Sequence, residues 1–372
     1  MRYYIIAGEH SGDMHGADLI AEIKKIDHHA HFWSCGGQLM QKVMGKPCAI
    51  DCTKMSYMGL DFFKKFYKLW SMLKFCETSL IEYNPHAVVL IDYSGFNMRI
   101  ASFAKRNGFH VYYYIPPKIW AHGSKRITSI KRDVKKVFSI LPFEVDYYHD
   151  HAYLDAYYVG NPLVKKAADH VINLLFRKEN ELDEWPIIAL LPGSRIDEVK
   201  RMLPIMAAAA DNFKSYQFVV AGLSHMPSAL YRNLCPTSIK IVFDQTYDLL
   251  ATAQVGIIAS GTASLEAALF NLPQIVVYKT NPIAYFMYKC ITTIKYISLV
   301  NLLVDKAAVP ELIQYQLTLK KLNETLTMVL YETNKQQLKA YHHIKKILGN
   351  REAALQTAKI IIASTKRQLV SH

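Results

Sequence analysis

The sequence lacks a long uninterrupted apolar run. The best candidate is broken by Lys289 and Lys295, whereas a helix that spans a bilayer needs about 20 consecutive apolar residues. Residues 1–13 carry one basic residue before an apolar run that ends in a glycine loop, so they predict a first β-strand and lack the apolar core of a signal peptide. We therefore expect a soluble or peripheral protein.

Cysteine is scarce as well. The chain has six cysteines among 372 residues, and only Cys48 and Cys52 lie close together, without a second pair to complete a zinc site. This usage is typical of reduced thiols in a cytosolic protein. The sequence also lacks clusters of His, Asp and Cys with ligand spacing, and a DxD-type element that would hold a divalent ion. It therefore predicts no metal and no other cofactor.

Acidic residues are outnumbered by basic ones. Lys and Arg total 44 against 31 Asp and Glu, which gives a net charge of +13. Such a field attracts phosphates, nucleic acid or an anionic membrane surface. The lysines are dispersed through amphipathic segments and no nucleic-acid module is evident, so we do not expect a nucleic-acid partner.

The length and the hydrophobic pattern predict two α/β domains with a helical C-terminus. Short apolar runs alternate with amphipathic stretches, which indicates mostly parallel sheets covered by helices. The pattern pauses between residues 160 and 184 and restarts at Pro186, which predicts domains at 1–165 and 186–345 and a terminal helical segment at 346–372. From Pro310 the chain reads as helical to its end, with a break at residues 349–350. The predicted strands cover 3–7, 88–92, 111–115, 137–140, 187–191, 217–221, 240–243, 255–260 and 274–278.

Three glycine-containing turns follow predicted strands. Residues 8–13 (GEHSGD) run directly into a helix, so that backbone N–H groups face a ligand or simply connect the two elements. Residues 191–195 (LPGSR) add an arginine, which suits a pyrophosphate; alternatively Arg195 pairs with Glu198. Residues 260–266 (SGTASLE) place a carboxylate one turn into a helix, where it binds a ribose diol or caps the helix.

These turns belong to a series of motifs that spans nearly the whole chain. The motifs are AGEHSGDMHGA at 7–17, GGQLM at 36–40, YMG at 57–59, YYIPPKIWAHG at 113–123, LPFE at 141–144, VGNPL at 159–163, LPGSRIDEV at 191–199, SGTASLEAAL at 260–269 and NLLVDKAAVPELIQ at 301–314. In this order, the series resembles the lipid-A-disaccharide synthase family.

The resemblance implies a GT-B glycosyltransferase, with two Rossmann-like doubly wound domains facing across a cleft. Such an enzyme of Gram-negative lipid A biosynthesis transfers 2,3-diacylglucosamine from its UDP derivative to the 6-hydroxyl of 2,3-diacylglucosamine 1-phosphate. The anomeric centre is inverted and UDP is released. The two substrates and an anionic inner-membrane surface are the implied partners.

The resemblance also implies site residues. Gly193, Ser194 and Arg195 would hold the diphosphate, and Asn301 would lie close to the donor. The phosphate and ribose would be bound by Ser260, Gly261, Thr262 and Glu266, with Ser11 as a further substrate-binding residue on the first glycine loop.

The resemblance does not identify the catalytic base directly. The family commonly shows IDAPDFN, whereas this chain reads IDYSGFN at 91–97, so Gly95 replaces the second acid. Because inversion needs a base for the acceptor hydroxyl, Asp92 is the first candidate, with Glu9 and Asp13 as the others. Asp92 alternatively only orients its loop. His10 and His122 flank these loops and are interpreted as wall residues.

An aromatic and lysine-rich segment at 60–75 predicts how the enzyme meets lipid. One broad helical face, with lysines around it, is typical of an interfacial helix on anionic lipid. It carries Phe62, Phe63, Phe66, Tyr67, Trp70 and Leu73. The alternative is a core-facing helix with a solvated lysine rim. The acyl chains of the substrates favour a cytoplasmic protein that is peripheral on the inner face of the inner membrane.

Other interpretations stay open. A UDP-N-acetylglucosamine 2-epimerase would share the nucleotide loops without an acyl groove. A nicotinamide oxidoreductase is disfavoured because residues 8–13 do not keep the G-x-G-x-x-G spacing. The terminal helix at 351–370 packs back on the first domain or exchanges with a second copy in a homodimer, since both bury the same apolar face.

Overall fold

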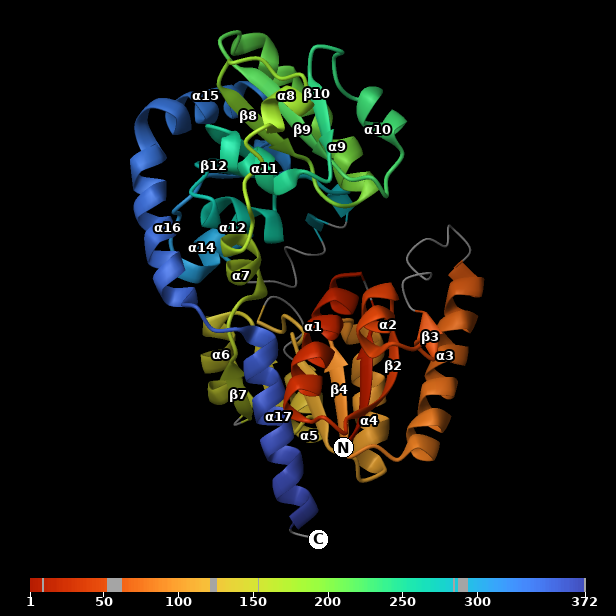
Figure 1. Cartoon of the computed structure of the whole chain (residues 1–372). Coiled ribbons are helices and arrows are strands. Elements are labelled where there is room, and N and C mark those ends of the chain that lie inside the picture. Colours follow the sequence, from red (N-terminus) through yellow and green to blue (C-terminus); the bar gives the residue numbers. More distant parts are fainter. Residues whose placement is uncertain are drawn as a thin grey trace. The chain divides into compact units, whose positions relative to one another are not determined.

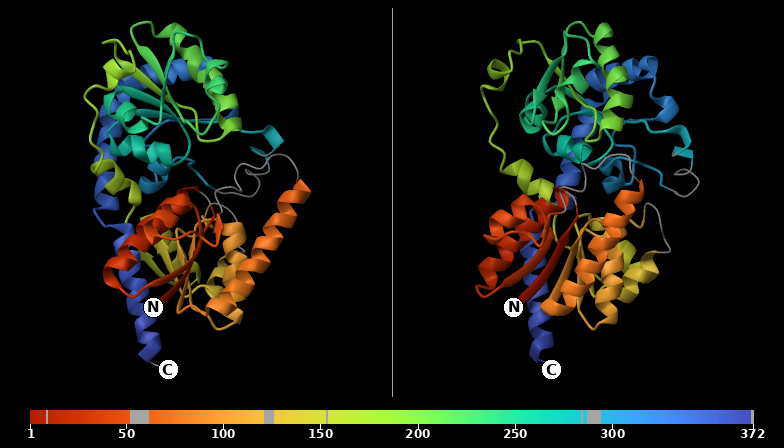
Figure 2. Two further views of the ribbon diagram at one scale, coloured as in Figure 1. Left: turned by 45° about the vertical axis from the view of Figure 1, so that its right-hand side comes forward. Right: turned by 90° about the vertical axis from the view of Figure 1, so that its right-hand side faces the viewer.

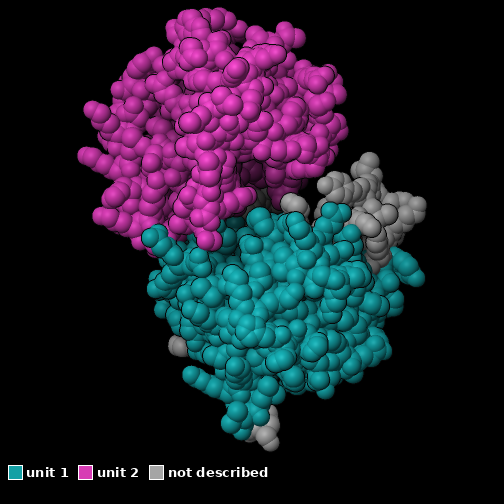
Figure 3. Space-filling model, in the orientation of Figure 1, with its two compact units in different colours: residues 1–162, 350–372 teal, residues 163–349 magenta. Residues whose placement is uncertain are grey.

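The computed structural model describes residues 1–8, 10–51, 62–120, 126–152, 154–283, 285–286 and 294–370. The chain divides into two compact units (Figure 3). Unit 1 comprises Met1–Pro162 together with Asn350–His372, and unit 2 comprises Leu163–Gly349.

Unit 1 is built on a parallel sheet with the strand order β3-β2-β1-β4-β5-β6-β7. Its strands are β1 (Arg2–Ala7), β2 (His31–Gly36), β3 (Ile50–Asp51), β4 (Ala87–Ile91), β5 (Val111–Tyr114), β6 (Lys136–Ser139) and β7 (Asp155–Tyr158). Its helices are α1 (His10–Ile26), α2 (Gln38–Met44), α3 (Phe62–Tyr83), α4 (Ser94–Arg106), α5 (Arg126–Asp133), α6 (Pro142–Ala152) and α17 (Ala353–Val370).

Helices cover both faces of this sheet (Figures 1 and 2). Alternate residues of β1 divide between two apolar clusters: Tyr4 and Ile6 pack with α3, α4, α5 and α6, whereas Tyr3 and Ile5 pack with α1, α2 and α17. Because both faces are buried, the central strands are continuous apolar runs, as the sequence showed.

The C-terminal helix lies beside α1, the first helix of the chain (Figure 1). Ala358, Ile361 and Ile362 of α17 are buried in the same cluster as Ile20 of α1. The hydroxyl of Tyr112 on β5 donates a hydrogen bond of 2.9 Å to Ser364 Oγ. α17 is thus a structural part of unit 1, although it follows unit 2 in the chain.

Unit 2 repeats the plan, with the parallel order β10-β9-β8-β11-β12-β13. Its strands are β8 (Ile187–Leu191), β9 (Gln217–Gly222), β10 (Lys240–Phe243), β11 (Val255–Ala259), β12 (Gln274–Tyr278) and β13 (Glu311–Ile313). The helices are α7 (Pro162–Ala168, which begins at the boundary), α8 (Phe176–Glu179), α9 (Ile196–Ala208), α10 (Ser228–Arg232), α11 (Thr246–Thr252), α12 (Thr262–Leu269), α14 (Leu299–Val304), α15 (Leu319–Met328) and α16 (Asn334–Leu348), with 3-10 turns at Ala209–Asn212 and Gln314–Gln316 and a π-helical turn at Val329–Thr333.

The expected fold class is confirmed: two doubly wound parallel-sheet units and a helical C-terminus are present. One detail of the prediction was wrong. The segment after Pro310 is not helical throughout, because Glu311–Ile313 forms β13 at the edge of the second sheet, paired with β12. A strand of three residues is too short to show a period of its own. The predicted helix break is confirmed, since α16 ends at Leu348 and α17 begins at Ala353.

In the described ranges, none of the helices has both the length and the apolar character needed to cross a bilayer.

Candidate functional site

Each sheet reverses its strand order at one point. In unit 1 the reversal lies between β1 and β4, and in unit 2 between β8 and β11. In open parallel sheets, ligands bind outside the carboxyl ends of the strands at this switch point. Residues 8–13 and 92–95 follow β1 and β4, and residues 192–195 and 260–262 follow β8 and β11. The switch point of each unit is therefore bordered by two loops that carry predicted site residues.

In unit 1 the two loops touch at a glycine. The Tyr93 ring lies so close to Gly8 that a side chain there would overlap it. Ser11 is exposed in the first turn of α1, which follows the loop at Gly8. Glu9, His122 and the side chain of His10 lie outside the described residues.

The turn that carries Asp92 is strained. Asp92 and Tyr93 have φ angles of 49° and 45°, a left-handed conformation that costs energy for residues other than glycine. The Asp92 carbonyl oxygen accepts hydrogen bonds from the Tyr113 hydroxyl at 2.7 Å and from Asn97 Nδ2 at 2.8 Å. The surrounding structure thus holds the turn through its backbone.

The Asp92 carboxyl group lies in an environment that suits a base. Burial raises its pKa above the ordinary value, and this effect outweighs the opposing hydrogen bond from the Tyr93 N–H and the positive charge of Lys118. A base is most effective when its pKa approaches the working pH.

Asp13 has a different environment. Its side chain is buried, and its two oxygens accept hydrogen bonds from the backbone N–H groups of Gly37 at 2.7 Å, Leu39 at 3.0 Å and Met40 at 3.1 Å. It therefore caps the N-terminus of α2. Because these three N–H groups already use both carboxylate oxygens, this geometry argues against Asp13 as the base.

In unit 2 the turn after β8 is shaped by Gly193. Its φ of 112° favours glycine, and an added Cβ would overlap the Glu198 side chain. Glu198 accepts hydrogen bonds from Ser194 N at 3.1 Å and from the Arg195 guanidinium at 3.0 Å. The alternative considered for Arg195, pairing with Glu198, is thus observed.

The ion pair with Glu198 leaves most of the Arg195 side chain exposed to solvent. The Arg195 side chain is 78% exposed, and exposed pairs contribute only about 0–1 kcal/mol. The Glu198 carboxylate accepts hydrogen bonds from both the Ser194 N–H and the guanidinium, so an anionic group already lies at the N-terminus of α9. The same donors are therefore arranged for an anion at the N-terminus of α9.

The turn after β11 supplies exposed donors at the N-terminus of α12. Gly261 and Thr262 are exposed, whereas Ser260 Oγ donates to the Ile297 carbonyl oxygen at 2.9 Å. Glu266 accepts a hydrogen bond of 2.8 Å from the Tyr247 hydroxyl. Burial and the nearby Glu266 raise the pKa of Tyr247, which keeps it a donor. Glu266 is thus oriented by Tyr247.

Asn301 is buried, and its amide is engaged within the protein. Nδ2 donates to the Val309 carbonyl oxygen at 2.9 Å and to Glu311 Oε1 at 2.8 Å, and Oδ1 accepts from Val309 N at 2.9 Å. Glu311 also accepts hydrogen bonds from Ile297 N and Ser298 N, each at 3.0 Å. The pair Asn301 and Glu311 therefore fixes the loop that receives the Ser260 hydroxyl.

Two acidic residues that support the candidate sites were not predicted from the sequence, although both lie inside the family motifs. One is Glu311. The other is Glu144, which is buried and accepts hydrogen bonds from the Trp120 indole at 2.8 Å and from Ser139. Burial raises the pKa of Glu144, while Lys118 opposes that shift. Glu144 thus anchors the segment that carries Lys118 near Asp92.

The membrane-facing prediction falls partly outside the described part of the chain, because the side chains of Phe62, Phe63 and Phe66 are not described. Further along α3, Tyr67 is 72% and Trp70 is 52% exposed. The expected place of Leu73 on the lipid-facing side was wrong, because Leu73 is buried with Met72 on the core face. The described part of α3 therefore has an apolar core face and a second, exposed aromatic face.

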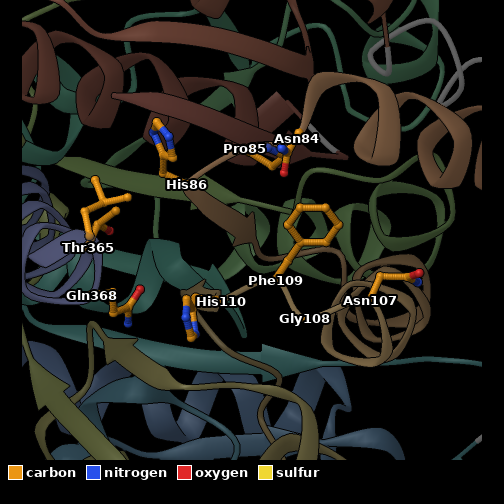
Figure 4. A pocket seen from close by; sticks show the side chains of 10 residues that line it. Asn84, Pro85, His86, Asn107, Gly108, Phe109, His110, Thr365 and Gln368 are labelled. Atoms are coloured by element: carbon orange, nitrogen blue, oxygen red, sulfur yellow. The ribbon is translucent and has the colours of Figure 1, made fainter. Parts of the chain in front are cut away.

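A separate pocket of about 270 Å³ lies at the opposite end of the first sheet (Figure 4). It is lined by residues 84–86, 107–110 and the end of α17, which precede β4 and β5 or close over them. It is therefore not at the switch point. No group of three or more potential metal-binding His, Cys, Asp or Glu residues is found in the described ranges.

The fold has close counterparts among solved structures. The glycotransferase of kitacinnamycin matches with a TM-score of 0.67, at 10% identity over 98% of this chain and 99% of that one. The UDP-GlcNAc 2-epimerase from Neisseria meningitidis bound to UDP-GlcNAc matches with a TM-score of 0.62, at 12% identity over 99% and 100%. Two doubly wound parallel-sheet units define the GT-B class of fold, to which glycosyltransferases belong.

Sequence relatives specify the family. The family model described as lipid-A-disaccharide synthetase matches residues 3–364. The lipid-A-disaccharide synthase of Syntrophus aciditrophicus (strain SB) is 31% identical over 98% of this chain and 97% of its own length. The chain therefore belongs to the lipid-A-disaccharide synthetase family. The predicted family, enzyme class and overall function, a glycosyltransferase that makes the lipid A disaccharide, are confirmed.

Proposed function

We propose that unit 2 binds the UDP part of the diacylglucosamine donor and that unit 1 binds the monosaccharide 1-phosphate acceptor beside Asp92. The observation that carries this proposal is the placement of the two loop sets at the two switch points. Arg195, the Ser194 N–H and the exposed turn before α12 supply donors for the diphosphate. Glu266 is oriented for the ribose by Tyr247.

In the proposed reaction Asp92 takes the proton of the acceptor 6-hydroxyl as that oxygen bonds to the anomeric carbon. The bond from this carbon to the diphosphate breaks on the opposite side, and UDP leaves with the electron pair. Arg195 and the N-terminus of α9 stabilise the negative charge that develops on the leaving group.

The assay that tests this function measures UDP release in detergent from UDP-2,3-diacylglucosamine, with and without the acceptor and with and without a chelator. We expect release that requires the acceptor, survives the chelator and yields a disaccharide phosphate. Turnover of unacylated UDP-N-acetylglucosamine instead would favour the epimerase alternative.

Lys118 is expected to set the pH range of this reaction. Its charge opposes the burial effect that raises the pKa of Asp92. The variant Lys118→Met should therefore move the acid limb of the kcat/KM profile to higher pH, because Asp92 then protonates more readily. Lys105→Met, which removes an exposed charge from α4, is the matched control. An unchanged acid limb in Lys118→Met would show that Asp92 is not the group whose protonation lowers kcat/KM.

We also propose that α3 meets an anionic membrane surface at the cytoplasmic side of the inner membrane. The exposed aromatic side chains of Tyr67 and Trp70 carry this proposal. The variant with both changed to Ser should lose most of its cosedimentation with vesicles that contain anionic lipid, while UDP binding persists. Tyr331→Ser, at a similarly exposed tyrosine on unit 2, should bind vesicles like the parent. Retained binding of the α3 variant would place membrane contact elsewhere.

A further inference from the structure

Unit 2 carries an apolar groove that the site described above does not include. Its volume is about 470 Å³. One wall comes from the segment after β12 and the other from the end of β13. The groove is lined by Pro282, Tyr285, Phe286, Ile313, Tyr315 and Gln316.

The groove gathers large apolar side chains that remain exposed. Phe286 is 69% and Tyr315 is 76% exposed, and the adjacent Ile283 is 72% exposed. Single exposed apolar residues are ordinary, but several around one groove mark a surface that binds an apolar ligand.

The two walls are fixed to each other. Gln314 is buried, and its side-chain amide bonds both backbone groups of Thr280: Nε2 donates to the carbonyl oxygen at 3.0 Å, and Oε1 accepts from the N–H at 3.1 Å. Gln314 itself has a φ of 54°, a left-handed conformation that turns the chain at the end of β13. The groove is therefore built into the fold by a paired buried amide.

Strand β13 contributes both to the groove and to the contacts that support the proposed donor site. Glu311 and Ile313 are alternate residues of β13, so their side chains lie on the same face about 7 Å apart along the strand. Glu311 holds the 297–301 loop, and the carbonyl oxygen of Ile297 in that loop accepts the Ser260 hydroxyl. One short strand thus links the turn that would hold the donor phosphate to the apolar groove.

We propose that this groove binds an acyl chain of the donor sugar. The inference rests on the donor site proposed above, because it requires the UDP group to lie at residues 193–195 and 260–266. A sugar attached to that diphosphate carries its acyl chains away from the nucleotide. The groove supplies an apolar surface that β13 connects to the 297–301 loop, which contacts Ser260. Binding of the chain would remove both the chain and the exposed rings from water.

The test compares two ligands on the full chain in detergent. Phe286→Ser and Tyr315→Ser change one residue on each wall, and Leu174→Ser is the matched control because Leu174 is 93% exposed elsewhere on unit 2. For each variant, the affinity for UDP and for UDP-2,3-diacylglucosamine is measured without acceptor. We expect both groove variants to bind UDP like the parent and to bind the acylated donor at least about tenfold more weakly.

Each other outcome has a distinct meaning. Parent-like affinity for the acylated donor in both groove variants, with or without a loss of vesicle binding, overturns the groove proposal alone. A parent protein that binds UDP but not the acylated donor overturns the proposed donor site and the groove together. Retained UDP affinity in the variants shows that they are folded, and Tyr315→Ser decides the matter if Phe286→Ser fails to fold.

Discussion

The variant Asp92→Asn is expected to lose about 10²–10⁴-fold in kcat while its affinity for UDP stays unchanged. The amide cannot take the proton of the acceptor hydroxyl, but it fills the same space at the end of β4. The turn is held through its backbone by Tyr113 and Asn97, so the substitution should not distort it. Single-turnover formation of the disaccharide, together with calorimetric binding of UDP, measures the two effects separately.

Gly95 provides a second arm of this experiment. A Cβ at Gly95 would meet nothing within 4 Å, and position 95 lies in the first turn of α4, where a carboxylate is favourable. We expect the single variant Gly95→Asp to fold. We expect the double variant, Asp92→Asn with Gly95→Asp, to recover part of the turnover that Asp92→Asn loses. Near-normal turnover in the single variant Asp92→Asn would instead move the base to Glu9, because Asp13 is committed to the cap of α2.

The variant Arg195→Ala is expected to weaken the binding of UDP by about 10- to 100-fold, since hydrogen bonds to charged groups contribute about 1.5–3 kcal/mol. The loss should appear in the donor KM and in direct UDP binding. It should not appear in thermal stability, because the Arg195 side chain is 78% exposed and its pair with Glu198 is weak in water.

Arg201 supplies the matched control on the same helix. It is exposed on α9, so Arg201→Ala removes the same formal charge without touching the turn at residues 193–195. Equal losses in the two variants would mean that UDP responds to the general positive field of the protein, and the specific role of Arg195 would then be withdrawn.

The sheets could be predicted from the sequence because their central strands are buried on both faces. All five residues of β4 and of β8 are buried. Each of these strands therefore appears in the sequence as an uninterrupted apolar run. The two shortest edge strands carry no such signal. β3 has two residues and β13 three, and their pairing depends on neighbours far away in the sequence.

The candidate site was predictable to the extent that its parts are contiguous. The turns at 193–195 and 260–262 are short motifs that end a strand and begin a helix, so local pattern places them. The partners of the acids are not local. Asp13 bonds residues 24–27 positions away, and Glu266 is oriented by Tyr247, 19 positions earlier. The distinction between a capping acid and a candidate base therefore required the folded structure.

The position of α17 has a consequence for the order in which the chain folds. Unit 2 is continuous, so all of it can be assembled once Gly349 has emerged from the ribosome. Unit 1 is not, because one apolar face of its sheet is completed by Ala358, Ile361 and Ile362 near the C-terminus. Although domains generally fold in the order of synthesis, here the N-terminal unit reaches its final packing last, because the apolar side of α1 is covered only after residues 353–370 have been synthesised.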